Sequence, residues 1–486
     1  MGSSKKQKVV VIGGGITGLA AAFYLQKQSR ENSLPIEVIL VEGSPRLGGK
    51  VQTVVKDGFV IERGPDSFLE RKTSAAKLAK EVGMDHQLVN NTAGKSFVLV
   101  RDKLFPMPGG SIMGVPTQMK PFITTGLFSP AGKIRATADF VMPKSNPSED
   151  QSLGQFFRRR LGDEVVENLI EPLLSGIYAG DIDHLSLKAT FPQFLQVEQK
   201  YRSLIIGMGK TRPKKPKESS QSIKMQKGQF QTLKTGLQSL VDAIEQQLTD
   251  ITVLKNTKVE SVLKIGSKYQ VALNNAERID ADSLVVAVPG TVAQSIFSEY
   301  PFFDGFKNMA STSVATVAMA FDESALKDDI NGTGFVVSRN SDYTITACTW
   351  THKKWPHSAP PGKALLRCYV GRAGDEAIVD LSDEEISKIV LEDLNKTMDI
   401  AAEPDFTIVS RWKNAMPQYY VGHKDRVIQL KREVEDKLPG VWLAGSSFEG
   451  LGLPDCIDQA EAAVEYVLEF LKGSKTYAEK EAIHSK

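Results

Sequence analysis

The first residues of this chain that could do chemistry are three glycines in a fixed spacing. Gly13, Gly15 and Gly18 form a G-x-G-x-x-G pattern between the apolar run 9–12 and a helical pattern. Gly13 allows a tight turn, Gly15 lets the backbone approach a phosphate, and Gly18 lets the helix pack closely on its strand. A helix N-terminus also attracts anions. The segment predicts a pyrophosphate site made by Gly13, Gly14, Gly15, Ile16, Thr17 and Gly18.

An acidic residue stands where the ribose of a dinucleotide needs one. Glu42 follows the second apolar run, 36–41, which places a carboxylate at the end of the next strand. Gly48 and Gly49 then give a second close backbone approach, which a plain nicotinamide site does not need. A deeply buried flavin dinucleotide needs this approach and a cation to balance its phosphates. The contacts predicted in this segment are Glu42, Gly43, Ser44, Arg46, Gly49 and Lys50.

A second combination of strand, glycine loop and helix start occurs late in the sequence. The apolar run 441–444 leads into a glycine-rich loop at 445–455, and small residues in a helical pattern follow at 459–468. A helix N-terminus in this place would stabilise the negative charge that reduction puts on the pyrimidine edge of an isoalloxazine. The two signals together predict FAD as the cofactor.

The composition excludes several classes of function. The 486 residues carry a net charge of +2, so no whole-molecule field favours nucleic acid. No apolar run is long enough for a transmembrane segment, and residues 1–8 lack the apolar core of a signal peptide. The three cysteines and six histidines show no disulfide framework and no metal-binding spacing. We therefore expect a cytoplasmic protein that binds neither nucleic acid nor metal.

The stretch between the two dinucleotide signals predicts further structure of two kinds. Residues 257–273 alternate between apolar and polar, which is typical of a half-buried β-meander, and 284–288 are uniformly apolar like a strand of a parallel sheet. Residues 115–225 have a mainly helical pattern, whereas β-branched and aromatic residues are frequent in 305–425. The last stretch predicts a second sheet.

These patterns predict an α/β protein with a Rossmann-like FAD-binding domain that is discontinuous in sequence. The length favours two or three domains, and substrate pockets form preferentially where domains meet. The predicted boundaries are 1–92, 226–305 and 426–475 for the FAD-binding domain, 93–114 and 306–425 for a substrate-binding domain with an antiparallel sheet, 115–225 for a helical insert with a mobile basic loop near 211–220, and 476–486 for a tail.

Five segments resemble the porphyrinogen oxidases of haem synthesis, and most of all their soluble Gram-positive type. The resemblance runs in order along nearly the whole chain, and its segment 171–181 is far more specific than a glycine loop. It implies the architecture shared by p-hydroxybenzoate hydroxylase and the amine oxidases. The segments that carry it are 62–68, 158–167, 171–181, 416–419 and 447–450.

The resemblance implies a flavoenzyme that removes six electrons from a porphyrinogen and so makes an aromatic porphyrin. FAD would accept two electrons in each of three rounds, and molecular oxygen would reoxidise it with formation of hydrogen peroxide. The pyrrole N–H becomes acidic as hydride leaves a bridging carbon, so no catalytic side chain is expected. Similarity to the soluble type favours coproporphyrinogen III, with four propionates, and leaves protoporphyrinogen IX, with two, as the alternative.

Two other classes of protein remain open at this point. A flavin amine oxidase or a carotenoid-type desaturase would share the cofactor-binding ends of the chain, but would lack the segments 64–68 and 171–181. A non-enzymatic interaction module would hold FAD only as a structural ligand, and its flavin face would be occluded. Peroxide formation with a reduced tetrapyrrole separates the porphyrinogen oxidase from both.

The resemblance also implies further FAD contacts. Val259 would meet the adenine through its backbone, and Trp412 is either a flavin contact or a core aromatic residue. Cys456 is either a covalent flavin anchor or a small apolar residue at a helix start, and we expect the second, with FAD bound non-covalently. The further contacts are Gly64, Pro65, Asp66, Ser67, Val259, Trp412, Ser446, Leu451, Gly452 and Leu453.

Three residues are expected at the substrate. Lys72 resembles the family's carboxylate-binding lysine, although a solvated lysine before a helix is an equal alternative. Gly176 and Ile177 are expected to line the apolar face of the macrocycle. The arginines 158–160 are expected to form a helix face paired with acids. The helical insert would make at most a peripheral membrane contact, and the protein is a monomer or a homodimer.

Overall fold

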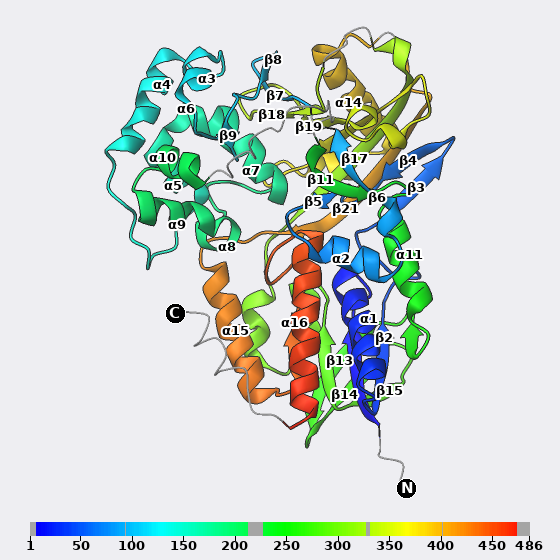
Figure 1. Ribbon diagram of the computed structural model, residues 1–486. Helices are drawn as coiled ribbons and strands as arrows, with labels where there is room; N and C mark the ends of the chain where they lie inside the picture. Colours follow the sequence, from blue (N-terminus) through cyan, green and yellow to red (C-terminus); the bar gives the residue numbers. More distant parts are fainter. Residues whose placement is uncertain (1–5, 93, 212–226, 327–330, 401, 474–486) are drawn as a thin grey trace, which may run out of the picture.

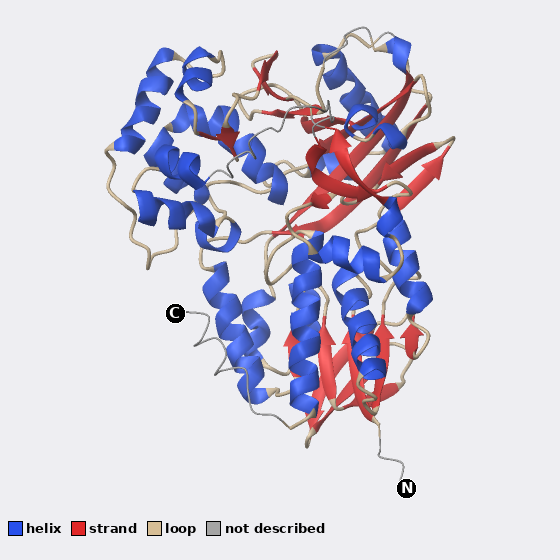
Figure 2. Cartoon of the chain, in the orientation of Figure 1, coloured by secondary structure: helices blue, strands red, loops and turns tan. Residues whose placement is uncertain are grey.

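The computed structural model describes residues 6–92, 94–211, 227–326, 331–400 and 402–473. A sheet covered by helices fills the lower half of the molecule, a cluster of helices lies at the upper left and a second sheet at the upper right (Figure 1). Figure 2 shows the same separation by type of secondary structure.

The lower sheet has five parallel strands in the order β12-β2-β1-β16-β22. Its strands come from both ends and the middle of the chain, so segments far apart in sequence become direct neighbours. Because all five strands are parallel, their carboxyl ends meet at one edge of the sheet. The strands are β1 (Gln7–Ile12), β2 (Ile36–Val41), β12 (Ile251–Leu254), β16 (Ser283–Val286) and β22 (Val441–Leu443).

Both faces of this sheet are buried, which explains why its strands are apolar without alternation. Val9 and Val11 of β1 belong to a core shared with α1, α11 and α16, whereas Val10 and Ile12 belong to a second core that includes α12 and α15. The helices are α1 (Ile16–Glu31), α11 (Gln238–Gln247), α12 (Gly290–Ile296), α15 (His423–Lys437) and α16 (Leu453–Leu471).

The β-meander predicted in the middle of the chain is confirmed. Strands β13 (Val259–Ile265), β14 (Lys268–Leu273) and β15 (Arg278–Ala281) pair antiparallel in sequence order. The apolar run that follows is β16, which pairs in parallel with β1 and β22. The chain therefore leaves the parallel sheet, forms a hairpin layer and returns to the sheet centre.

The second sheet has seven strands in the order β21-β17-β20-β19-β18-β7-β8. It confirms the sheet predicted in 305–425 and adds two strands from 96–106. Only the β18–β7 pair is parallel. Helix α14 (Asp383–Thr397) packs on one face and begins with a Ser382–Glu385 capping box. The strands are β7 (Ser96–Val100), β8 (Lys103–Pro106), β17 (Ser311–Asp322), β18 (Gly334–Val337), β19 (Ile345–Trp350), β20 (Lys363–Val370) and β21 (Phe406–Pro417).

The regular elements that the structure describes in 115–225 are helices joined by loops, apart from the short strand β10 (Val115–Pro116). The basic loop predicted near 211–220 lies outside the described residues except for Thr211, and so does the tail 476–486. The helices are α3 (Met119–Thr124), α4 (Pro130–Ala136), α5 (Leu153–Leu161), α6 (Asp163–Val165), a π-helical turn (Val166–Ile170), α7 (Glu171–Tyr178), α8 (Leu187–Thr190), α9 (Pro192–Tyr201) and α10 (Leu204–Thr211).

Short strands and one further helix connect the two large sheets. The hairpin of β3 and β4 and the three-stranded sheet β5-β11-β6 lie above the parallel sheet in the view of Figure 1. These elements are β3 (Thr53–Lys56), β4 (Phe59–Glu62), β5 (Phe68–Leu69), α2 (Ser74–Glu81), β6 (Leu88–Thr92) and β11 (Lys227–Leu233). Among the described residues, no helix combines the length and apolarity that crossing a membrane requires.

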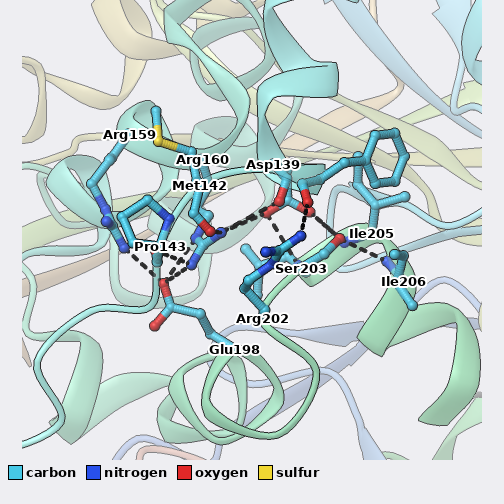
Figure 3. A network of polar contacts seen from close by, with 12 residues as sticks. Asp139, Met142, Pro143, Arg159, Arg160, Glu198, Arg202, Ser203, Ile205 and Ile206 are labelled. Carbon is cyan, nitrogen blue, oxygen red and sulfur yellow. Dashed lines mark hydrogen bonds and ion pairs between the residues drawn. The ribbon is translucent and has the colours of Figure 1, made fainter.

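A buried ion network holds the helical region together (Figure 3). Arg160, Glu198 and Asp139 are all fully buried. Arg160 Nε donates to Glu198 Oε1 at 2.8 Å, and Arg160 Nη1 lies 3.4 Å from Asp139 Oδ1. Asp139 Oδ2 also accepts from Ser203 Oγ at 2.5 Å and from the Ile205 amide at 2.9 Å. The network thus joins α5 and α9 to the start of α10.

The arginines 158–160 are paired with acids as expected, but the expectation that they share one helix face is wrong for Arg160. Arg158 contacts Asp163 and Glu167 near the surface at 3.2 and 3.1 Å. Arg160 lies two residues further along α5, which turns its side chain to the opposite, buried side of the helix.

Replacing Arg160 with methionine should destabilise the protein strongly, because the substitution leaves the buried carboxylate of Asp139 without its cation and that of Glu198 with Arg159 alone. We expect the free energy of unfolding, measured by urea denaturation, to fall by about 3–5 kcal/mol. Arg30→Gln is the matched control, because Arg30 pairs with Asp250 at the surface. An Arg160→Met protein as stable as the Arg30→Gln protein would contradict a stabilising role for the network.

Candidate active site

The first glycine loop connects β1 to α1 and opens into a cavity. A Cβ atom on Gly18 would lie 1.8 Å from the Gly13 carbonyl oxygen, so Gly18 is required by packing. Gly13 has a φ of +103°, and a Cβ there would lie 2.5 Å from the Ala287 carbonyl oxygen. Gly15 precedes the first turn of α1 and has no atom within 4 Å of the place of a Cβ. Free space for a ligand therefore begins at Gly15.

Glu42 connects the first glycine loop to the second. Its two carboxylate oxygens accept hydrogen bonds from the backbone amides of Gly14, at 2.6 Å, and Ser44, at 2.7 Å. Arg46 acts within the second loop, since its guanidinium donates to the Leu47 and Val51 carbonyl oxygens at 3.1 and 3.0 Å. The two side chains therefore hold the loops in place.

One cavity of about 1190 Å³ joins these loops to the helical region and to the seven-stranded sheet. It exceeds the roughly 300–1,000 Å³ of a pocket for one drug-sized ligand, so it has room for a dinucleotide and part of a second molecule. Twenty of the predicted site residues line it: Gly13, Gly15, Ile16, Thr17, Glu42, Gly43, Gly49, Lys50, Gly64, Pro65, Asp66, Ser67, Gly176, Ile177, Val259, Trp412, Ser446, Leu451, Gly452 and Leu453.

Five predicted residues do not line the cavity. Gly14, Gly18, Ser44 and Arg46 support the loops from behind, as their contacts show. Lys72 Nζ forms an ion pair with Asp455 in the first turn of α16. Lys72 is thus a paired lysine and not a freely solvated one, and its contact with a substrate carboxylate stays a prediction.

The donor set around the loops suits a flavin dinucleotide. Two helix N-termini border the cavity, that of α1 behind Gly15 and that of α16 behind Gly452. Lys50 donates through Nζ to the Ala415 carbonyl oxygen, and burial lowers the pKa of its ammonium group. An open backbone approach, two positive helix ends and one buried cation are what a buried pyrophosphate needs.

A partly buried ion pair fixes the loop 63–67 that forms one wall of the cavity. Lys354 Nζ lies 2.8 Å from Asp66 Oδ2, and Arg367 donates to the Gly64 carbonyl oxygen. Burial alone would raise the pKa of Asp66, but Lys354 and Arg367 outweigh burial and hold that pKa well below its usual range. Trp412 Nε1 donates to the Arg63 carbonyl oxygen at 2.8 Å from the same side. The carboxylate therefore stays ionised and the loop stays in place.

Lys354 and Arg367 were missed by the sequence analysis. Arg367 stands between residues 364–366 and 368–370 of β20, which carry no charge, and it is only 3% exposed. A lone charge in a buried strand is a signal of a buried partner, because a buried charge is costly unless it is paired. Lys354 carries no comparable signal, since it follows another lysine in the polar helix α13 (Thr351–Lys354).

Apolar residues form part of the cavity wall next to the helical region. Gly176 has no atom within 4 Å of the place of a Cβ, and the neighbouring Ile177 is 50% exposed although it is a large apolar residue. Val336 and Val337 of β18 line the cavity from the seven-stranded sheet. Within the described residues, no group of three or more side chains could hold a metal ion. The walls suit a flat apolar molecule.

Comparison with known proteins identifies the class. The family described as flavin containing amine oxidoreductase matches residues 16–468. Coproporphyrinogen III oxidase of Bacillus subtilis (strain 168) is 60% identical over 470 residues, which cover 96% of this chain and 99% of that protein. Protoporphyrinogen oxidase 1, chloroplastic, of Spinacia oleracea is 30% identical over 487 residues, which cover 95% of this chain and 84% of that protein. The crystal structure of a protein from Exiguobacterium sp. 255-15 matches with a TM-score of 0.85 and 38% sequence identity. The match covers 97% of this chain and 100% of that one.

The chain belongs to the flavin-containing amine oxidoreductases and, within them, to the porphyrinogen oxidase family. The resemblance stated from the sequence is thereby confirmed, as are the α/β fold class and the assignment to the flavin-dependent oxidoreductases.

Replacing Gly15 with valine should prevent flavin binding without harming the fold. The new side chain would enter the open space of the cavity next to the N-terminus of α1. The backbone should not be strained, because Gly15 has a φ of −66° that valine readily adopts. We expect the ratio of visible flavin absorbance to protein absorbance to fall at least about tenfold, which requires a loss of more than about 1.4 kcal/mol of binding free energy.

Gly18→Val is the contrasting variant, because its side chain would collide with the Gly13 backbone. It should lower the thermal unfolding midpoint of the flavin-free protein, which Gly15→Val should leave nearly unchanged. Full flavin content in the Gly15→Val protein would show that the pyrophosphate does not lie at Gly15.

Proposed function

We propose that this protein oxidises coproporphyrinogen III to coproporphyrin III, with FAD as cofactor and molecular oxygen as the final acceptor. The observation that carries the proposal is the single cavity, which runs from the two glycine loops to the apolar walls formed by α7 and β18. The Bacillus subtilis relative that is 60% identical bears the name of this activity. Flavin dependence follows from the family, and the choice of FAD is part of the proposal.

We assign the pyrophosphate of FAD to the cradle at Gly13, Gly15 and Lys50. Glu42 would bind the ribose, and Val259 at the start of β13 would contact the adenine, because both residues border the same loops. The isoalloxazine would lie against the wall of Gly64, Asp66 and their neighbours and against the start of α16. The remaining predicted contacts support these assignments: Gly14, Ile16, Thr17, Gly18, Gly43, Ser44, Arg46, Gly49, Pro65, Ser67, Trp412, Ser446, Leu451, Gly452 and Leu453.

Bound FAD would supply the hydride acceptor, which is the difficult part of the chemistry. The contribution of the chain is then to hold a flat ring between Gly176 and Val337, with its bridging carbon directed toward the cofactor wall. The apolar surroundings keep water from the reacting carbon. No strong base is required, since the pyrrole N–H becomes acidic as hydride leaves. Three such rounds remove six electrons.

We infer that FAD is held without a covalent bond to Cys456. Its thiol is 5% exposed and borders the cavity, and burial raises its pKa above the usual value. A protonated thiol is a poor nucleophile. Cys348, Cys368 and Cys456 are all free thiols, which supports our placement of the protein in the reducing cytoplasm.

Protoporphyrinogen IX is the second candidate substrate, because the spinach relative that bears its name covers 95% of this chain. The identity to that relative is 30%, half of the 60% found for the coproporphyrinogen relative. The two substrates differ in the number of propionates, and Lys72 does not help to choose, since it is paired with Asp455 outside the cavity lining.

The proposal is tested by aerobic oxidation of both porphyrinogens, followed through porphyrin fluorescence and peroxide formation. We expect the higher kcat/KM with coproporphyrinogen III, and one peroxide for each pair of electrons removed. The Gly15→Val protein is the matched control for spontaneous oxidation. A higher kcat/KM for protoporphyrinogen IX would overturn the substrate assignment, and oxidation of neither would overturn the proposed function.

Replacing Gly176 with phenylalanine should obstruct entry of the ring. The side chain would fill open cavity space between α7 and the seven-stranded sheet. We expect KM to rise about tenfold, or about 1.4 kcal/mol, with little change in kcat, because the cofactor wall is untouched. Gly305→Phe is the matched control, since Gly305 is exposed and also has free space around it. Unchanged KM in the Gly176→Phe protein would show that the substrate lies elsewhere.

A further inference from the structure

Two arginines line the cavity on the side of the seven-stranded sheet, and the FAD assignment uses neither. Arg339 follows β18, and Arg372 follows β20. Both loops lie against α7, since Arg339 contacts Glu171 in its first turn and the Ala373 amide donates to the Ala179 carbonyl oxygen at 2.9 Å. The two guanidinium groups are close enough for the charge of Arg339 to lower the pKa of Arg372.

Arg339 is partly neutralised by a buried carboxylate. Its Nε forms an ion pair with Glu171, whose side chain is only 5% exposed. Burial raises the pKa of Glu171 even though Arg339 and Arg372 act in the opposite direction. Arg339 Nη2 also approaches the Gly180 carbonyl oxygen at 3.3 Å.

Arg372 lacks comparable partners. Within the described residues its guanidinium makes no hydrogen bond, and its nearest acid is Asp375, with 3.6 Å between Nε and Oδ2. The Asp375 side chain is 51% exposed, so solvent screens its charge, whereas burial lowers the pKa of Arg372. A half-buried guanidinium that lines a cavity and lacks hydrogen bonds gains more from a new anion than one that is already paired.

The neighbourhood fixes Arg372 and offers one more donor. Gly371 has a φ of +86°, and a Cβ there would lie 2.6 Å from the Ser313 carbonyl oxygen, which holds the backbone in one position. Ser175 lies one turn after Glu171 on α7 and lines the cavity, and its buried hydroxyl has no hydrogen-bond partner. A buried hydroxyl without a partner indicates a ligand group that the protein does not itself supply.

The net charge of the groups around Arg372 favours the binding of one anion. Arg339, Arg372 and Glu171 together carry one net positive charge. The nearby Asp181 and Arg158 are engaged elsewhere, with His184 at 3.1 Å and with Asp183 at 3.3 Å. One bound carboxylate would therefore neutralise the group.

We propose that Arg372 and Arg339, together with the Ser175 hydroxyl, form a binding subsite for one propionate of the porphyrinogen, with Glu171 as the internal anion that competes for Arg339. This inference rests on the proposed function, because the propionate belongs to the proposed substrate. Arg372 has the larger role, since its guanidinium is the one without hydrogen bonds. Arginine holds a carboxylate through two parallel hydrogen bonds, which would also fix the orientation of the ring.

The direct test is the Arg372→Gln protein, which loses a charge but no internal hydrogen bond. The Kd for the stable product coproporphyrin III, measured by fluorescence titration, should rise at least about tenfold, as expected for loss of a charge-assisted hydrogen bond. KM for coproporphyrinogen III should rise similarly, with kcat within about threefold of the wild type. Arg372→Lys should restore part of the affinity, and Arg30→Gln, at an exposed surface pair, should have no effect.

A second ligand separates charge recognition from a general change of shape. The tetramethyl ester of coproporphyrin III keeps the ring but carries no carboxylate, so Arg372→Gln should leave its Kd unchanged. Equal weakening for the acid and the ester would overturn the subsite, and so would an unchanged Kd for the acid.

Glu171→Gln should act in the opposite direction. Removing the competing carboxylate frees Arg339, so the Kd for coproporphyrin III should fall several-fold, and weaker binding would contradict the role given to Glu171. Wild-type protein that neither binds coproporphyrin III nor oxidises the porphyrinogen would defeat the proposed function. Wild-type turnover with unaltered binding in the Arg372→Gln protein would defeat only the subsite.

Discussion

The structure depends on one constraint, which is that the parallel sheet must be buried on both faces. Strands β1 and β22 come from opposite ends of the chain, and β16 between them pairs with both. These apolar strands can exclude water only when helices and the meander cover both faces. The chain therefore returns to the sheet after each excursion, at β12, β16 and β22. The return places the loops before α1 and before α16 at the same edge. A cavity bordered by residues more than 400 positions apart in the sequence follows from this packing.

The second part of the site is formed where the seven-stranded sheet and α7 face those loops. Charged contacts hold this junction, since Lys354 reaches Asp66 and Arg367 reaches the Gly64 backbone. Arg367 is buried and the Lys354–Asp66 pair is partly buried, so separating either contact would leave a charge with little water and no partner. The helical region is stiffened in a similar way by Arg160 and its acids. The cavity is therefore bordered by rigid walls, which suits a reaction in which positioning is the main task of the protein.

Much of this organisation is present in local sequence patterns. The glycine spacing, the alternation in the meander and the apolar run of β16 depend on neighbours in the sequence, and the structure has each of them. Contacts between distant residues leave no such pattern. Lys72 pairs with Asp455, almost 400 residues away, and Arg160 differs from Arg158 only in the direction in which α5 turns it. Arg339 and Arg372 likewise become neighbours only when β18 and β20 enter the same sheet.

Cofactor and porphyrinogen are proposed to share one cavity. Anaerobic rapid mixing of the flavin-loaded protein with coproporphyrinogen III tests it most directly, with the visible flavin absorbance as the readout. We expect this absorbance to disappear at a rate that saturates with porphyrinogen concentration. Because each flavin accepts two of the six electrons, one porphyrinogen should reduce the flavin of three protein molecules. Flavin absorbance that stays unchanged while the protein binds the porphyrinogen would contradict the shared cavity.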